Sequence, residues 1–314
     1  MIRFSLPRYF QSIILVLGTL MICFSAGPLF GWQQGIIIPM SRMNAEERAK
    51  VDAAVPQKSI VPPKKKRKLL VFDVNGKYLG HNSIPWANYA FRAIGQKTGA
   101  FEVVLSRNDD DFLADNLSQY DAICFNNVVG TPFVDPVRFH NIVQFVRGGG
   151  GLIGIHGSTV AFLMIGDGGE DVFPEFKKML GAQGANHRSK REPIHVKVEV
   201  PGHPITAMFP QDGFLKEDEF FRYNKYYSRK DLRVLLSIDV EKSRLDKDPS
   251  QKQERPDRDY GLAWIRRYGK GRVFYSAFAH QVDTFYDPKM LQFYLAGIQY
   301  ALGDLEAPDD PSEK

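Results

Sequence analysis

GLIGIHGS, residues 151–158, is the stretch that decides the fold. Its apolar half is typical of a short buried strand, and the glycines around His156 predict a tight turn at the strand's end. Such a turn presents one side chain above the sheet, as the nucleophile elbow does in hydrolases. Here that side chain is a histidine, which can act as a base, a proton donor or a metal ligand. We expect His156 to contribute little to the core; the alternative is a structural histidine that forms a hydrogen bond at a strand end.

Around this stretch, apolar strands alternate with helical patterns. Strands are predicted at 69–74, 101–105, 122–125 and 152–155, and helices at 86–98 and 137–146. Near-continuous apolar strands that alternate with helices predict a mostly parallel, flavodoxin-like α/β sheet with helices on both faces. In such sheets the ligand site lies outside the carboxyl ends of the strands.

The second half of the chain is richer in strand patterns. These lie at 195–200, 232–238, 262–266 and 272–278, and an amphipathic helix is predicted at 289–302. The polar stretch 243–259 predicts an exposed loop. One α/β domain is therefore expected over 69–304, followed by a disordered tail at 305–314.

The segment before the domain has two predicted parts. Residues 1–26 combine a positive start with an apolar run, which indicates a signal peptide or, if uncleaved, a membrane anchor. Residues 27–68 contain a short helix that begins after Asn44, with Glu47 in the capping-box position, and then a Pro- and Lys-rich solvated linker. We expect an exported protein, periplasmic or extracellular, that meets the membrane only through this first segment.

Charge and cysteine content exclude several functions. Residues 1–68 carry a net charge of +8 and the remainder −3, so the domain is mildly acidic, which argues against a nucleic-acid partner. The chain has two cysteines, too few for a disulfide framework. Cys124 lies inside a predicted strand, where a buried inert thiol is expected.

Histidines follow several of the predicted strands. His81 follows the first strand, and His280 follows the strand that ends at Phe278. Because carboxyl ends of parallel strands share one edge, these side chains should converge with His156. Convergent histidines with nearby carboxylates are the composition of a metal or acid/base site, although the irregular spacing is a weak metal signal. His187 lies in another predicted loop, whereas His140, His195 and His203 are expected to be structural.

An acidic cluster lies among aromatic residues in the second half. Asp218 and Glu219 precede Phe220 and Phe221, which provide a cleft wall or a surface for a sugar to stack on. We therefore expect catalytic roles for His156, Glu219, Asp218 and His280, and substrate contacts from His81, Phe221 and His187. The cofactor is not determined by the sequence; a divalent metal would be held by His156, His187 and His280.

Several motifs together resemble the trehalose-utilisation (ThuA-like) family, exported planctomycete-type members in particular. They are residues 69–74, 82–86, 151–156, 202–205, 218–219 and 268–275 together with His280. The resemblance implies a class I glutamine-amidotransferase-like fold without its catalytic cysteine. It also implies metabolism of trehalose or related disaccharides, and site roles for His156, His187, Asp218, Glu219 and His280. This chain departs from the family at Val160 and Val282, where related sequences carry an aspartate and a histidine.

Two functional classes stay open at this point. The first is a carbohydrate-processing enzyme that uses acid/base chemistry, with or without a metal, on a disaccharide or keto-glycoside. The second is a non-catalytic carbohydrate-binding or scaffold domain, which Val160 and Val282 favour. A glutamine amidotransferase is excluded, because thioester chemistry needs a cysteine at the elbow and His156 occupies that position. In either class the partner is a small carbohydrate.

Overall fold

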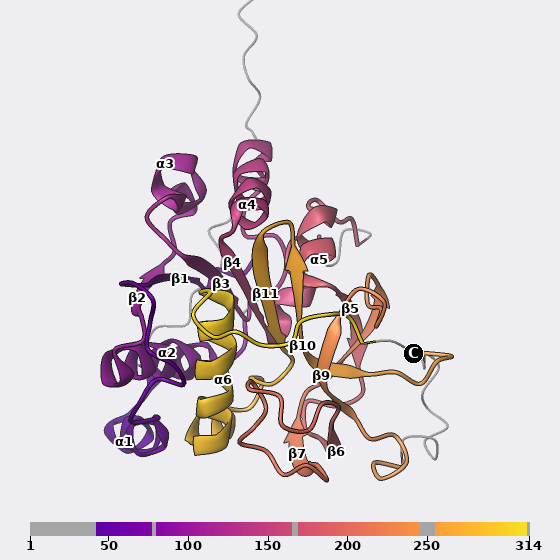
Figure 1. Cartoon of the computed structure of the whole chain (residues 1–314). Helices are drawn as coiled ribbons and strands as arrows, with labels where there is room; N and C mark the ends of the chain where they lie inside the picture. Colours follow the sequence, from indigo (N-terminus) through magenta and orange to yellow (C-terminus); the bar gives the residue numbers. More distant parts are fainter. Residues whose placement is uncertain (1–41, 77–79, 165–168, 245–254, 313–314) are drawn as a thin grey trace, which may run out of the picture. The chain divides into compact units, whose positions relative to one another are not determined.

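A computed structural model describes residues 42–76, 80–164, 169–244 and 255–312 (Figure 1). The predicted signal peptide or anchor, residues 1–26, lies outside these ranges. Within them, every helix is too short or too polar to cross a membrane.

One large mixed sheet dominates the described part of the chain. Its strand order is β2-β1-β3-β4-β11-β10-β9-β6-β7, and β5 and β8 form a separate two-stranded antiparallel sheet. The strands of the large sheet are β1 (Lys68–Phe72), β2 (Glu102–Ser106), β3 (Ala122–Asn126), β4 (Gly151–Ile155), β6 (Glu192–Val198), β7 (Phe214–Asp218), β9 (Arg233–Ile238), β10 (Gly261–Tyr268) and β11 (Gly271–Ser276). The small sheet pairs β5 (Gln183–His187) with β8 (Phe221–Lys225).

The large sheet has a parallel half and an antiparallel half. Strands β2, β1, β3, β4 and β11 are parallel to one another. From β11 onward the pairs are antiparallel, through β10, β9 and β6 to β7. All five residues of β3 and of β4 are buried, as expected for parallel strands covered on both faces. The predicted α/β fold with a β-rich second half is confirmed.

Helices cover both faces of the parallel half. In Figure 1, α1, α2 and α6 gather on one face, and α3, α4 and α5 lie on the other. Their bounds are α1 (Ala45–Ala54), α2 (Ile84–Thr98), α3 (Ala114–Leu117), α4 (Pro136–Gly148), α5 (Pro174–Leu180) and α6 (Pro288–Ala301). The predicted capping box of α1 is present, since Asn44 and Glu47 bind each other's backbone N–H groups. Asp135 and Asp287 cap α4 and α6 more simply, since each carboxylate accepts a backbone N–H of the first turn.

The stretch before β1 packs on the domain instead of forming a solvated linker. The amide N–H groups of Ile60 and Val61 donate to the buried side chain of Gln299 in α6. The Arg67 guanidinium, 11% exposed, pairs with both Asp121 and Asp304. The composition of this segment indicated a linker because prolines and lysines dominate it. The residues that bind the segment lie far away in the sequence, so composition could not indicate them.

The predicted disordered tail is also packed as far as Ser312. Leu305 is buried, and the Arg267 guanidinium and the Tyr300 hydroxyl both contact the Asp309 carboxylate. Ser312 donates its N–H to the Leu232 carbonyl, 2.8 Å away. The prediction of disorder for 305–312 is therefore wrong.

The polar loop at 243–259 is only partly described. The prediction of exposure fails at its last residue, because Asp259 is buried. The Asp259 carboxylate pairs with the Arg229 guanidinium at 2.8 Å. That ion pair fixes the loop end against the turn that precedes β9.

Candidate functional site

His156 follows β4 directly and begins a short 3₁₀ turn, His156–Val160. Its φ is +41°, a left-handed conformation that non-glycine residues adopt rarely and that is frequent at functional sites. Gly157 is required next to it, because a Cβ at that position would lie 2.7 Å from a methyl of Val129 and 3.1 Å from the His81 ring. The predicted strand-end turn is present.

The expectation that His156 stands clear of the core is wrong. Its side chain is 0% exposed, its Nδ1 lies 2.7 Å from the Ala277 carbonyl oxygen, and its ring lies 5.1 Å from the Phe221 ring. The ring is buried because the segments carrying Glu219 and Phe221 close over the sheet edge.

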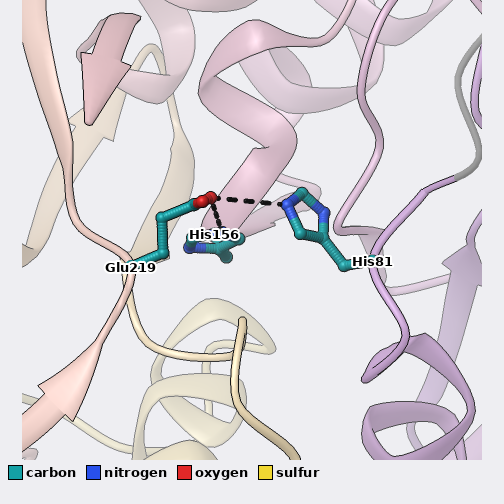
Figure 2. A group of neighbouring side chains, drawn as sticks. All are labelled: His81, His156 and Glu219. Carbon is teal, nitrogen blue, oxygen red and sulfur yellow. Dashed lines mark hydrogen bonds and ion pairs between the residues drawn. The ribbon is translucent and has the colours of Figure 1, made fainter. Parts of the chain in front are cut away.

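Four histidines surround the carboxylate of Glu219, which is 3% exposed. Their Nε2 atoms lie 3.2 Å (His156) and 3.6 Å (His81) from Oε2, and 3.3 Å (His187) and 3.6 Å (His280) from Oε1. Figure 2 shows His81 and His156 directed at one side of this carboxylate. We call these five residues the Glu219 centre.

Both halves of the fold contribute to the Glu219 centre. His81, His156 and His280 follow the parallel strands β1, β4 and β11, as predicted from their strand-end positions. His187 ends β5, and Glu219 lies between β7 and β8. The small β5–β8 sheet thus brings its residues over the carboxyl edge of the large sheet, and Phe221 pairs with His187 across it.

Asp218 plays a different part from its neighbour. Its carboxylate accepts hydrogen bonds from the N–H groups of residues 219, 279, 280 and 281 and from the Thr284 hydroxyl. These five donors occupy the carboxylate, so Asp218 holds the turn that carries His280 instead of offering a free oxygen to a ligand. Burial raises the pKa of Asp218, and the charge of His156 and these hydrogen bonds oppose that shift.

The turn after β11 is fixed from a second side. Ala279, with φ +133°, accepts hydrogen bonds on its carbonyl from the Ser83 hydroxyl and from Asn127 Nδ2. Asn127 also accepts the N–H of Gly157 on its side-chain oxygen, at 3.2 Å. Asn127 therefore links the two turns that carry His156 and His280. Nothing in the sequence indicated this role, because a single asparagine after a strand is not a distinctive pattern.

Burial sets the charge state of the centre. Burial lowers the pKa of His81 and of His280 to about 4, so both rings are neutral at pH 7. Burial opposes ionisation of Glu219, but hydrogen bonds with His156 and His81 outweigh it and hold the pKa of Glu219 far below its usual value. The centre is an anionic carboxylate among imidazoles.

The side chains present fit a divalent transition metal. His81, His156 and Glu219 each offer a ligand atom, and these atoms lie within 4.8 Å of one another. The Nδ1 atom of His81 is buried without a hydrogen-bond partner, so this nitrogen can accept a ligand without the loss of a protein hydrogen bond. Imidazole with carboxylate is a donor set that suits zinc, iron, copper or nickel.

A cavity of about 530 Å³ borders the β5–β8 sheet at Asn186 and Arg222. These two residues form the pair next to His187 and Phe221. Its lining comprises Ala185, Asn186, Arg222, Tyr223, Asn224, Arg255, Pro256 and Asp257. Apolar atoms form the larger part of its surface, to which Tyr223 adds an aromatic side chain, and asparagine, arginine and aspartate side chains supply polar groups. Such a surface suits a hydroxylated small molecule.

The remaining candidates lie elsewhere. His203 Nε2 lies 3.0 Å from the Pro308 carbonyl oxygen, and its Nδ1 accepts the Ile205 N–H. Val160 is buried and packs near Gly184 of β5. Cys124 is buried inside β3, and burial raises the pKa of its thiol, so it is not a reactive thiolate.

Comparisons with known proteins give one family and a consistent fold. A family model described as trehalose utilisation (ThuA) matches residues 68–301. A ThuA-like protein of Bacteroides uniformis ATCC 8492 superposes with a TM-score of 0.60 at 19% identity, over 76% of this chain and 92% of its own. A ThuA-like protein of Parabacteroides merdae ATCC 43184 gives 0.52 at 17% identity, over 80% and 93%. The search of curated proteins gave no match.

Proposed function

Because the chain belongs to the trehalose-utilisation (ThuA) family, we propose that it is a carbohydrate-processing enzyme whose reaction takes place at the Glu219 centre. Family membership supports a role in carbohydrate utilisation. The reaction and the substrate are proposals that rest on the chemistry of the site.

One observation carries the proposal: four imidazole Nε2 atoms converge on one buried carboxylate. Burying an ionised carboxylate costs several kcal/mol unless charge and hydrogen bonds compensate. Apolar side chains would fill the same space without this cost in free energy. Stability of the fold therefore does not explain why these residues are here. Perturbed titratable groups gathered in one place are typical of sites that move protons or hold a metal.

The proposed reaction is acid/base elimination on a keto-glycoside, such as a disaccharide in which one ring carries a keto group. A lone pair of His156 or Glu219 removes a proton from the carbon next to the carbonyl, and the C–H electron pair forms a carbon–carbon double bond. The glycosidic C–O bond on the adjacent carbon breaks, and its oxygen takes up a proton from another group of the centre. Atoms and electrons balance without an oxidant or reductant.

A divalent cation held by His81, His156 and Glu219 would polarise the substrate carbonyl, and the base would then be the Glu219 oxygen that faces His187 and His280. The chain's own residues orient the sugar. Phe221, packed on the rings of His156 and His187, offers an apolar face, and the cavity lined by Asn186 and Arg222 has room for a second sugar unit.

A non-catalytic carbohydrate-binding domain is the second candidate. Val160 and Val282 favour it, because both put an apolar side chain where the family resemblance implies an aspartate and a histidine. Val160 is buried and Val282 packs on the core, so neither position offers a proton carrier.

We also propose that the mature domain works outside the cytoplasm and descends from an amidotransferase-like fold. The N-terminal apolar run supports export, and the left-handed His156 after a central parallel strand supports the kinship. Detection of the domain in a periplasmic or culture fraction, with the N-terminal run removed or retained, tests export.

Metal analysis of the purified protein, paired with a screen on disaccharides and their 3-keto forms, tests the function. We expect turnover of one substrate by the parent protein and none by His156→Ala, with His195→Ala as the matched control, since His195 lies in β6 away from the centre. Sugar binding without turnover in the parent would instead support the binding domain.

A further inference from the structure

The four histidines of the Glu219 centre present the same atom, Nε2, to the carboxylate, but they are not chemically equivalent. A neutral imidazole carries its proton on one nitrogen and a lone pair on the other, and the partner of Nδ1 decides which is which. His156 and His280 have Nδ1 partners of opposite kinds.

His156 has its proton on Nδ1. That nitrogen lies 2.7 Å from the Ala277 carbonyl oxygen, which can only accept a hydrogen bond. When the ring is neutral its Nε2 atom therefore has the lone pair, and a proton carried on Nε2 as well donates to Glu219 Oε2, 3.2 Å away. His156 is suited to bind a cation or to take up a proton.

His280 has the opposite arrangement because of Gln281. The Gln281 amide nitrogen lies 2.5 Å from the Lys190 carbonyl oxygen, so the –NH₂ group is on that side. The same nitrogen lies 2.8 Å from His280 Nδ1 and donates to it. An Nδ1 that accepts leaves the proton of the neutral ring on Nε2, the atom directed toward Glu219 Oε1.

The position of Gln281 is fixed on both sides of this contact. Its backbone N–H, like that of His280, donates to Asp218 Oδ1 at 3.1 Å. Its side chain is 7% exposed, so water does not compete for the amide. The backbone N–H and the side-chain nitrogen of Gln281 are both held by hydrogen bonds. The side-chain oxygen therefore cannot turn toward the imidazole without breaking one of them.

We propose that Gln281 is a positioning residue that fixes His280 as the Nε2–H tautomer, so that His280 donates a hydrogen bond to an oxygen of the bound substrate and does not ligate a metal. Its role in the reaction rests on the proposed function, whereas the tautomer does not. A neutral imidazole that donates to a carbonyl oxygen stabilises the negative charge that develops when the adjacent carbon loses its proton. Lone pairs for a cation then come from His156, His81 and Glu219.

Long-range ¹H–¹⁵N spectra of the full-length labelled protein test the tautomer directly. We expect His280 to show an unprotonated Nδ1 and a protonated Nε2, and His156 to show a protonated Nδ1, with each ring assigned by its loss in His280→Asn or His156→Asn. Gln281→Leu should move the His280 signals toward a mixture of tautomers. Gln183→Leu is the matched control, a glutamine equally buried at 6% exposure in β5, and should leave them unchanged.

A protonated Nδ1 on His280 in the parent protein, or an unchanged His280 tautomer in Gln281→Leu, would overturn the proposal. Because these spectra are recorded without sugar, they decide on Gln281 even if the proposed reaction is absent. If the reaction is present, Gln281→Leu should lower kcat in proportion to the fraction of His280 that loses its Nε2 proton, about twofold for an equal mixture, and change KM little. His280→Ala, which removes the donor, should lower kcat by about a hundredfold. A fall in kcat/KM through KM alone would contradict the donor role.

Discussion

At the scale of single residues, the Glu219 centre is held by contacts between side chains and backbone turns. Each histidine that follows a parallel strand is held by a turn whose backbone is bound from elsewhere, as Asn127 binds the turn after β4 and Asp218 the turn after β11. Placement of the rings therefore depends on side chains that have no contact with a ligand.

Glu219→Gln should remove function with a modest loss of stability. The amide keeps the shape but not the charge, so affinity for a divalent cation should fall by at least about 100-fold, and turnover with it. Loss of charge-assisted hydrogen bonds from the histidines should lower the free energy of unfolding by about 1–3 kcal/mol. Urea unfolding and metal analysis measure the two effects.

Glu217→Gln is the matched control for that change, because Glu217 is exposed and its ion pair with Arg191 lies at the surface. Parent-like cation binding by Glu219→Gln would show that the carboxylate is not a ligand.

Asp218→Asn should be the more damaging of the two neighbouring changes. An amide puts N–H groups against the backbone N–H groups that the carboxylate accepts, which leaves buried donors without a partner. We expect a loss of about 3 kcal/mol or more in the free energy of unfolding, measured in urea, whereas the exposed Asp283→Asn should change it by less than about 0.5 kcal/mol. Equal, small effects of the two variants would mean that the turn holds without Asp218.

At the scale of elements, the segments at both ends of the domain are part of its structure. Residues 60–67 are bound to α6 and to the loop before β3, and the tail to Ser312 is bound beside β9. Both were predicted to be free, because composition reports the average character of a segment and not the partner that a single arginine or serine finds.

Arg67→Ala should destabilise the domain by about 2–4 kcal/mol in urea unfolding, since it leaves Asp304 buried without its partner. Lys66→Ala, at an exposed neighbouring position, should have no measurable effect. If both variants unfold like the parent protein, residues 60–67 are a linker after all.

A second ion-pair network joins elements of the antiparallel half and predicts a pH dependence. Burial opposes ionisation of Glu199, but the Arg229 guanidinium and the Ser237 hydroxyl outweigh it and lower the pKa of Glu199 below 4.5. A depressed pKa in the folded state adds stability above the unfolded value of about 4.5, and this is lost as the pH falls further. The stability difference between the parent and Glu199→Gln should therefore shrink between pH 7 and pH 3.

Urea unfolding at several pH values measures that difference. Glu241→Gln serves as control, because Glu241 is exposed and its ion pair with Arg258 lies at the surface. A difference that stays constant down to pH 3 would contradict the lowered pKa.

The sequence predicted the parallel half of the sheet closely and the β5–β8 sheet not at all. Strands such as AICFN in β3 are buried on both faces and are apolar throughout, so they stand out in the sequence. QGANH in β5 and FRYNK in β8 lack a regular alternation, because one end of each strand is exposed and their pairing is interrupted by register shifts.

The same difference explains which site residues were found. His81, His156 and His280 were predicted to converge because strand order alone brings strand ends together. The functions of Asn127, Ser83 and Gln281 depend on carbonyl groups far away in the sequence, such as those of Ala279 and Lys190, and no local pattern indicates such partners.

At the scale of the whole molecule, the Glu219 centre joins the two halves of the fold. A cation bound there would link the turns after β1 and β4 to the segment between β7 and β8. Binding to the folded state alone should raise the free energy of unfolding by about 2.7 kcal/mol when the free cation is at 100 times its Kd.

Thermal unfolding with added zinc, and again after chelation, measures this effect. The parent protein should show a higher Tm with the metal and lose the increase on chelation, and Glu219→Gln should show neither change. A zinc-dependent increase that persists in Glu219→Gln would place the cation elsewhere on the protein.

The Glu219 centre is drawn from segments that lie between His81 and His280, so it cannot form before His280 has been synthesised. A growing chain cannot assemble the centre, and a chain exported unfolded would pass through the cytoplasm without it. The metal or sugar that such a protein first meets is then set by the compartment in which folding finishes and not by the one in which synthesis occurs. The order of the residues along the chain thus decides where the site can first be loaded.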